Sequence, residues 1–174
     1  MKAGVALRLA WLAMIAAIGV GTACSREPAK NAAPPASSTP APSAASYQGD
    51  LPPLPQVQFA FARPEPITRA AYEFAARYPD VLRYMPCFCG CERHGHGNNE
   101  DCFVAKRETG GRPVWNPHGI GCGICIDVAR EAARLHKSGV PLDEVRADIE
   151  RKYRSEYPTS TPTPAVPRTT ATHH

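Results

Sequence analysis

The chain has few aromatic residues and no excess of charge in the part that would fold. Aromatic residues make up 7% of its 174 residues. Between residues 67 and 157, acidic and basic side chains nearly balance, and no basic stripe is interleaved with aromatic rings. A nucleic-acid surface needs such a stripe, because phosphate contacts carry much of the affinity. We therefore expect no nucleic-acid partner.

The usual constellations of a catalytic site are also missing. No glycine-rich loop follows a predicted strand, so the sequence has no phosphate cradle. No Ser/His/Asp arrangement and no pair of carboxylates is readable, which removes the basis for hydrolase chemistry. Cys125 is followed by Ile126 and not by histidine, so the c-type haem attachment motif is absent as well. We therefore expect a protein that is not an enzyme.

The N-terminus predicts export from the cytoplasm. Lys2 and Arg8 form a positive region, which precedes an apolar run that is short for a membrane span, then small residues, then Cys24. This pattern predicts a signal peptide over residues 1–23 and lipidation of Cys24. The mature protein would then be anchored to a membrane through this lipid, on its periplasmic or cell-surface face. Ordinary cleavage is the alternative, and it would leave Cys24 as a spare thiol.

Composition divides the rest of the chain into a folded domain and two flanking segments. Residues 24–66 are rich in Ala, Pro and Ser, which predicts a disordered tether whose apolar last part can lie along the domain. Residues 158–174 are rich in Pro and Thr and predict a disordered tail. The folded part is then one small domain over residues 67–157. A core of this size is modest, and such domains are often stabilised by disulfides or a metal.

The periodicity of apolar residues predicts a mainly α domain with three helices. Helical spacing extends over residues 67–78 and 122–137, and Pro141 begins a third helical pattern. Gly139 is typical of a helix C-terminus. A long loop rich in Cys, His and Gly separates the first two helices, with a candidate strand at residues 114–115. A loop of this length usually has a function or is cross-linked by disulfides or a metal.

The loop contains soft metal donors at regular spacing. Cys87, Cys89 and Cys91 occupy every second position, so an extended backbone would point all three thiols to one face, with neighbouring Cα atoms about 6.5–7 Å apart. This spacing lets two thiolates bind one ion and makes a disulfide between neighbours awkward. A second pair, Cys122 and Cys125, stands at a predicted helix start, where the helix dipole favours the thiolate.

Together these thiols predict a site for a soft metal ion. Thiolates are ligands of both Cu(I) and Zn(II), and the thiols outnumber the ligands of one tetrahedral site, which slightly favours copper. The protein would sequester the ion, deliver it or use it structurally, with a metal donor or acceptor protein as partner. We expect the ligands to be Cys87, Cys89, Cys91, Cys102, Cys122, Cys125 and His96, with His94 and His118 as further donors in the loop.

Two other uses of the thiols stay open. Lipidation of Cys24 leaves six of the seven cysteines, and in an oxidising compartment these could pair into disulfides. The domain would then be a structural or interaction module that is held together by disulfides and binds no metal. Alternatively, Cys122 could be the attacking thiolate and Cys125 the resolving thiol of a thiol–disulfide redox protein. A thioredoxin-like fold would place a βαβ pattern before this pair, and none is readable.

Several motifs together resemble those of a bacterial family. The sequence reads YMPCFCGC at 84–91, GH at 95–96, DCFV at 101–104, VWNPHG at 114–119 and CGIC at 122–125. These motifs resemble the PCYCGC-motif lipoproteins, with Phe88 in place of the tyrosine that names the motif. The resemblance covers nearly all of residues 72–164 and implies a small, extracytoplasmic, lipid-anchored domain. It implies little about activity, because the family is known mainly by its motif.

Overall fold

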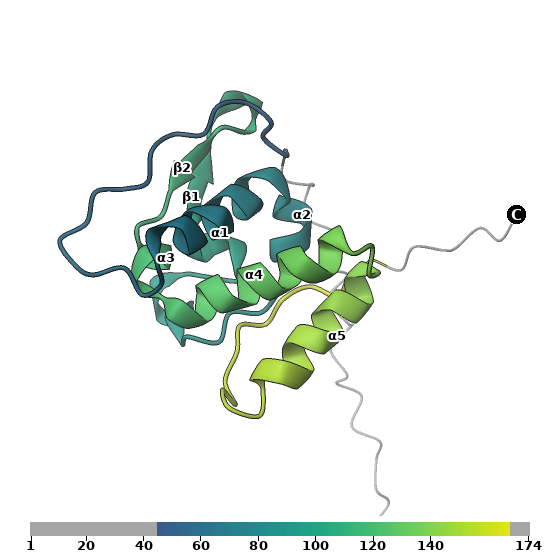
Figure 1. Cartoon of the computed structure of the whole chain (residues 1–174). Coiled ribbons are helices and arrows are strands. Elements are labelled where there is room, and N and C mark those ends of the chain that lie inside the picture. The colour runs from purple at the N-terminus through teal and green to yellow at the C-terminus, as the bar shows by residue number, and fades with distance from the viewer. Residues whose placement is uncertain (1–44, 168–174) are drawn as a thin grey trace, which may run out of the picture. The chain divides into compact units, whose positions relative to one another are not determined.

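The computed structural model describes residues 45–167 of the chain. The predicted signal peptide, the predicted lipidation site Cys24 and the last residues of the predicted tail lie outside this part. Within it, the structure is mainly helical, which confirms the predicted fold class (Figure 1). None of the described helices is long and apolar enough to cross a membrane.

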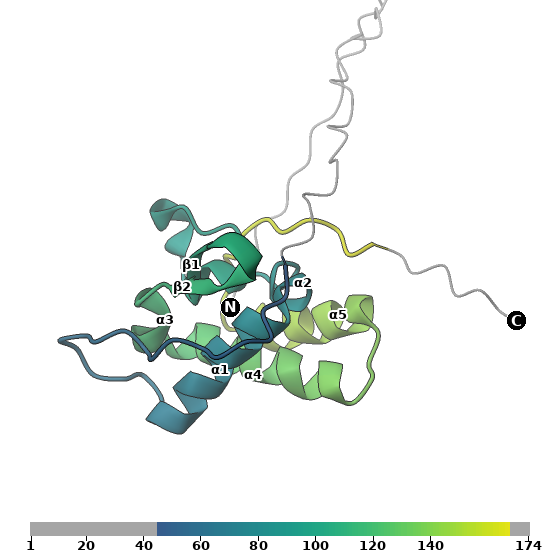
Figure 2. The ribbon, with the colours of Figure 1, turned by 90° about the horizontal axis from the view of Figure 1, so that it is seen from above.

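Three long helices form the body of the domain. They are α1 (Glu65–Arg77), α4 (Gly123–Lys137) and α5 (Leu142–Tyr153). Helix α4 packs against both α1 and α5 and lies between them in Figure 1; Figure 2 gives the view from above. All three begin and end close to the residues that the sequence predicted. Gly139 follows α4 with φ +76°, a conformation that favours glycine, so the predicted helix stop is confirmed.

The apolar stripes of these helices meet in one core. Tyr72 of α1 is central to it, since its ring contacts Phe103 and Trp115 edge-on at centroid distances of 5.1 and 5.2 Å. Its hydroxyl donates a hydrogen bond to the carbonyl of Asn116 at 2.6 Å. These contacts fasten the long loop to α1. The helices contribute the buried residues Ala71, Phe74, Ala75, Val128, Ala129, Ala132, Val145 and Ile149.

The long loop contains short regular elements. Strand β1 (Val104–Arg107) pairs antiparallel with β2 (Pro113–Trp115), so the candidate strand at 114–115 is confirmed. One turn of helix, α2 (Pro79–Leu82), precedes the loop, and α3 (His118–Gly121) immediately precedes α4. The remaining short elements are the 3₁₀ turns η1 (Cys91–His94), η2 (Glu100–Cys102) and η3 (Thr109–Gly111).

Both flanking segments pack on the domain where the structure describes them. In residues 45–64, the Ala62 N–H donates to the carbonyl of Ile120 at 2.9 Å, and Leu54 is buried. Residues 158–167, which we call the C-terminal strap, turn back after α5 and bury Thr161. Two hydrogen bonds between Thr161 and Cys87 hold this proline-rich segment against the domain. The folded body extends beyond residues 67–157 at both ends.

Candidate metal centre

The six described cysteines converge at one place. The sulfur of Cys87 lies 3.1 Å from that of Cys89 and 3.0 Å from that of Cys91. It also lies 3.4 Å from the sulfur of Cys102 and 3.3 Å from that of Cys125. Bonded sulfurs are about 2.05 Å apart, so these are contacts between free thiols. Among residues 45–167 no disulfide is present, and the structure therefore does not support the alternative of a module held together by disulfides.

A turn at Gly90 brings the first three thiols together. Gly90 has φ +72° and precedes η1, so the chain bends between Cys89 and Cys91. In an extended strand, residues 87 and 91 would stand about 13 Å apart, whereas their sulfurs touch. The extended geometry that would point all three thiols to one face therefore does not apply to this run. The reason is that a left-handed glycine lets the run curl around a common point.

The second predicted pair joins the same cluster from the start of α4. The sulfur of Cys125 lies 3.0 Å from that of Cys122, 3.2 Å from that of Cys102 and 3.5 Å from that of Cys89. Cys122 is the residue that precedes α4, and Cys125 lies in its first turn. The two predicted groups of cysteines, 87–91 and 122–125, thus form one centre, to which η2 adds Cys102.

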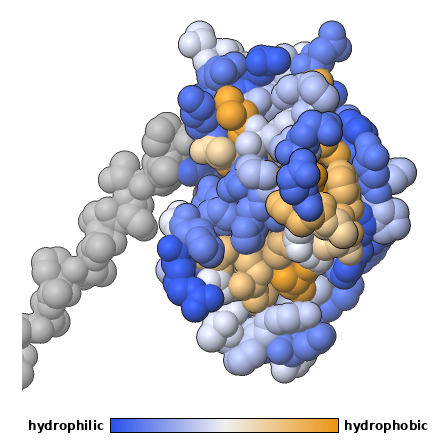
Figure 3. All heavy atoms as spheres, turned by 90° about the vertical axis from the view of Figure 1, so that its left-hand side faces the viewer, coloured by the Kyte–Doolittle hydropathy of each residue, from blue (hydrophilic) through white to orange (hydrophobic). Residues whose placement is uncertain are grey.

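The centre is buried except along one edge. Cys87, Cys91, Cys102 and Cys125 are at most 2% exposed, whereas Cys89 is half-buried. A hollow of about 500 Å³ opens beside it and is lined by Phe59, Cys89, Asn116, Pro117, His118, Gly121 and Cys122. Figure 3 views the molecule from the side on which α3 lies in Figure 1 and shows apolar surface there, surrounded by polar side chains. Water or a partner can therefore reach the cluster through the edge at Cys89.

The donors form two overlapping groups that could each hold an ion. One group consists of Cys87, Cys89, Cys102 and Cys125, and the other of Cys89, Cys91, Cys102 and His118. Within each group the ligand atoms lie within 4.8 Å of one another. Zinc–sulfur bonds of about 2.3 Å give a tetrahedral edge of about 3.8 Å, so both groups have a suitable size. Cys122 touches the cluster but belongs to neither group.

His118 was not in the predicted set of ligands, although it was noted as a donor in the loop. Its Nε2 lies 3.8 Å from the sulfur of Cys89, and α3 begins at this residue. The only signal in the sequence was its place between a proline and a glycine, a few residues before Cys122. That signal is weak, because loop histidines often have no ligand role.

His96 lies against the centre as a hydrogen-bond donor. Its Nδ1 is 3.5 Å from the sulfur of Cys102, and its Nε2 is 3.1 Å from Nδ2 of Asn116. The orientation of the Asn116 amide follows from its other contacts, since Nδ2 donates to the Asp101 carbonyl and Oδ1 accepts from the His118 N–H. Nε2 of His96 must then accept, and the proton resides on Nδ1, facing Cys102. Burial lowers the pKa of His96, which favours this neutral form.

Contacts between the thiols lower the pKa values of some of them and raise those of others. A hydrogen bond from Cys102 lowers the pKa of Cys89, and another from Cys102 lowers that of Cys87. Contact with Cys102 raises the pKa of Cys125. At Cys122, a hydrogen bond with Cys125 acts to lower the pKa, but Cys89 and burial raise it to about 12. An attacking thiolate needs a lowered pKa, so this geometry does not favour Cys122 as a redox nucleophile.

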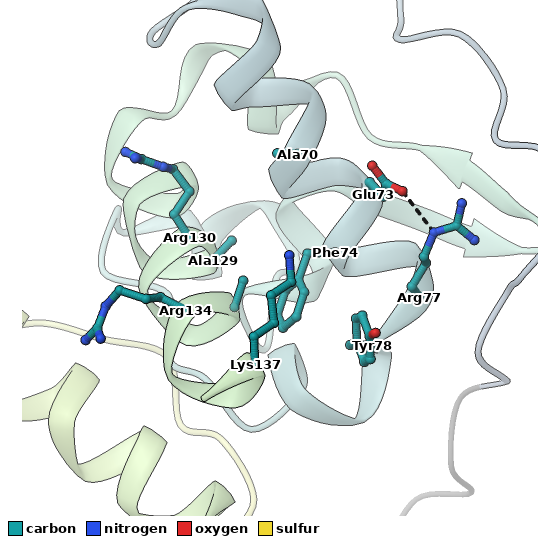
Figure 4. Close-up of a pocket in the computed structure, with 10 residues that line it drawn as sticks. Ala70, Glu73, Phe74, Arg77, Tyr78, Ala129, Arg130, Arg134 and Lys137 are labelled. Carbon is teal, nitrogen blue, oxygen red and sulfur yellow. Dashed lines mark hydrogen bonds and ion pairs between the residues drawn. The ribbon is translucent and has the colours of Figure 1, made fainter. Parts of the chain in front are cut away.

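A separate groove lies between α1 and α4. It has a volume of about 420 Å³, and Figure 4 shows it with the Glu73–Arg77 ion pair on its rim. Phe74 and Ala129 are among its apolar residues, and Arg130, Arg134 and Lys137 supply positive charge. None of its lining residues is a cysteine or a histidine, so it is not part of the metal centre.

Comparison with protein families gives one result. The family described as a protein of unknown function with PCYCGC motif matches residues 48–166. The chain therefore belongs to this family, as the motifs predicted. The comparisons with curated proteins and with solved structures each yielded no match. In this chain the motif carries Phe88, which is 3% exposed and packs on Tyr153 of α5 with ring centroids 5.8 Å apart.

Proposed function

We propose that this member of the PCYCGC-motif family binds a soft metal ion, Cu(I) or Zn(II), and does so as a lipid-anchored protein outside the cytoplasm. The observation that carries the proposal is the meeting of six free thiols at one buried point, with His118 beside them. Two sets of four donors within this cluster have the size of a metal site. Anchoring through Cys24 and the periplasmic or cell-surface location are proposed from the N-terminal sequence alone.

Electrostatics supports a bound cation. Hydrogen bonds with neighbouring thiols, that with Cys102 first, and burial raise the pKa of Cys125. At Cys122, the contact with Cys89 and burial raise the pKa despite the hydrogen bond with Cys125, because burial penalises a thiolate that has no cation beside it. A metal ion removes this repulsion by replacing the protons with a shared positive charge. Structural zinc sites of this kind contribute on the order of 10–16 kcal/mol of apparent binding free energy in small peptides. Such a contribution would be large for a domain with so small a core.

The open edge supports a role in which the ion is exchanged. A purely structural site is usually closed, with all four ligands buried. Here Cys89 and His118 line a hollow on the surface, so an ion could be passed to or from a donor or acceptor protein. We therefore propose sequestration or delivery as the main role and assign no catalytic step.

The test is the metal content of the full mature chain, purified in detergent micelles under reducing conditions. Cu(I) and Zn(II) are added separately, and bound metal is measured by native mass spectrometry and elemental analysis, with and without thiol alkylation. We expect stoichiometric metal and thiols that resist alkylation until a chelator is added. A reduced chain that binds neither ion, or a chain that carries three disulfides when it is purified without reductant, would overturn the proposal. Competition between the two ions identifies which one binds more tightly.

A further inference from the structure

We infer that the centre holds two divalent ions of the zinc class, which share the sulfurs of Cys89 and Cys102 as bridging ligands. This inference rests on the proposed metal-binding function and adds the number, charge and arrangement of the ions. Both four-donor groups contain Cys89 and Cys102. The remaining ligands are Cys87 and Cys125 at what we call the inner position, and Cys91 and His118 at the outer position.

The two groups overlap at residues that can each bind two ions. A thiolate sulfur has enough lone pairs to bind two ions, whereas an imidazole nitrogen binds one. The shared residues are both cysteines, and the histidine is a terminal ligand of one group only. A single ion at the inner position would leave Cys91 and His118 unused within reach of the bridging sulfurs. Two ions use every donor in both groups.

The net charge of the centre also favours two divalent ions. The centre is buried, so a large net charge is costly there. One divalent ion with four thiolates has a net charge of about −2, whereas two divalent ions with five thiolates and a neutral imidazole have about −1. Two monovalent ions with the same ligands would have about −3. The two ions are therefore divalent, although one site alone would suit Cu(I) as well.

The distances between donor atoms are close to those of a tetrahedral site in both groups. At the outer position, Cys89 Sγ and His118 Nε2 are 3.8 Å apart, and the sulfurs of Cys91 and Cys102 are 4.0 Å apart. Both values agree with the tetrahedral edge of about 3.8 Å. At the inner position the sulfurs are closer: Cys87 lies 3.1, 3.4 and 3.3 Å from Cys89, Cys102 and Cys125, and Cys125 lies 3.2 and 3.5 Å from Cys102 and Cys89. An ion there would therefore push the four sulfurs apart by about 0.3–0.7 Å.

The two positions differ in their access to solvent. The inner terminal ligands Cys87 and Cys125 are 1% and 0% exposed. The outer ligand His118 is half-buried and lines the hollow, as does the bridging Cys89. An ion at the outer position can therefore leave through the hollow, whereas the inner ion is enclosed. The outer ion is the one available for transfer, and the inner ion holds the loop together.

The first experiment counts the ions. Zn(II) is titrated into the reduced full mature chain and followed by native mass spectrometry, and the expected saturation is two ions per chain. Loading with an NMR-active cadmium isotope should then give two resonances that are coupled to each other through the bridging sulfurs. One ion per chain, or two uncoupled resonances, would overturn this inference and leave the proposed function intact. No bound ion would overturn both.

The second experiment separates the two positions with a matched pair of variants. His118→Gln removes a terminal ligand of the outer position, so we expect it to bind one ion instead of two. His94→Gln is the control, because His94 is exposed, belongs to neither group and has its ring 6.2 Å from that of His118. Circular dichroism of both confirms folding. Retention of two ions by His118→Gln, or equal loss in both variants, contradicts the assignment.

Release kinetics test the difference in access. With a chelator in excess, the two-ion protein should lose its metal in two phases of equal amplitude, the fast phase belonging to the outer ion. The fast phase should be absent from His118→Gln and from Cys91→Ser, which provides a second variant if the first folds poorly. A single phase in the two-ion protein would show that the positions do not differ in access, which contradicts the inner and outer assignment.

Discussion

Cys87 and Thr161 exchange two hydrogen bonds across 74 residues of sequence. The N–H of Cys87 donates to Thr161 Oγ1 at 2.8 Å, and the N–H of Thr161 donates to the Cys87 carbonyl at 3.0 Å. Thr161 is only 3% exposed. The pair fastens the C-terminal strap to the first cysteine of the centre, so a segment with no metal donor supports the geometry of the donors.

Thr161→Val should destabilise the domain. Valine keeps the branched shape of threonine but leaves the buried N–H of Cys87 without its acceptor, which costs about 1–3 kcal/mol. Urea unfolding of the metal-free and metal-loaded protein measures this cost. Thr159→Val is the control, since Thr159 is exposed and its change should stay within about 0.5 kcal/mol. Equal destabilisation by both variants would contradict the role of the strap.

Helix α3 carries His118 to the centre by packing Gly119 tightly against the loop. An added Cβ at Gly119 would lie 2.7 Å from the carbonyl oxygen of Cys102 and 2.9 Å from the hydroxyl of Tyr72. The first of these atoms belongs to the backbone and cannot move aside cheaply. Gly119→Ala should therefore cost about 1–3 kcal/mol and weaken metal binding, as measured by thermal unfolding and Zn(II) titration.

Gly121→Ala is the matched control for Gly119→Ala. It lies in the same short helix, but its added Cβ would meet the ring of Phe59 at 3.1 Å. Phe59 is 51% exposed, so its ring can turn away into solvent. We expect near-native stability and metal binding for Gly121→Ala. If both alanine variants behave alike, the close approach at Gly119 does not position His118.

The helices could be predicted closely from the sequence because their signals are local. Helix α4 combines an apolar stripe with a glycine stop at Gly139, and both features lie within a few turns of chain. The same holds for α1 and α5, which have Pro66 and Pro141 at their starts. The proximity of the cysteines could also be expected from the sequence, since closely spaced thiols in a small domain have few uses.

The arrangement inside the loop could not be predicted, because it depends on contacts between distant residues. The turn at Gly90 curls the run of cysteines, and only the positive φ in the structure reveals it. Nδ2 of Asn116 donates to Nε2 of His96, which leaves the proton of His96 on Nδ1. Oδ1 of Asn116 accepts from the N–H of His118. The contact between His96 and Asn116 joins residues twenty positions apart in irregular backbone, where no periodicity marks it. The C-terminal strap was missed for the same reason.

Arg107 connects another part of the loop to helix α1. Its guanidinium lies 2.7 Å from Oε1 of Glu100, and the two side chains are 13% and 11% exposed. It also donates to the carbonyls of Ala75 and Ala76 at the end of α1, at 2.8 and 3.2 Å. Burial raises the pKa of Glu100, and Arg107 lowers it in part. The ion pair thus connects η2, which carries Cys102, to the first helix.

Arg107→Met should destabilise the domain by about 3–5 kcal/mol near neutral pH, because it leaves a buried carboxylate unpaired. The pKa of Glu100 would then rise further above its unfolded value of 4.5, so the folded state favours the protonated form. The stability of the variant is therefore fully present below that value and is lost as pH rises through the folded-state pKa. Denaturant unfolding over a pH series measures this trend.

The double variant Arg107→Met with Glu100→Gln separates the charge from the packing. Glutamine has no charge to bury, so the double variant should recover part of the stability and lose the pH dependence. Wild-type protein, both single variants and the double variant form a complete cycle. If Arg107→Met is as stable at neutral as at acidic pH, the buried carboxylate is not the cause of its loss.

His96 provides a test that separates a ligand from a hydrogen-bond donor. His96→Phe keeps a ring in the site but removes the Nδ1–H that faces Cys102, so the number of bound ions should not change. Affinity should fall about 10–100-fold, the usual effect of losing a partner of a metal ligand, as measured by chelator competition. His94→Phe, at an exposed position, should leave affinity unchanged. Loss of an ion from His96→Phe would instead make His96 a ligand and overturn the assignment of its proton through Asn116.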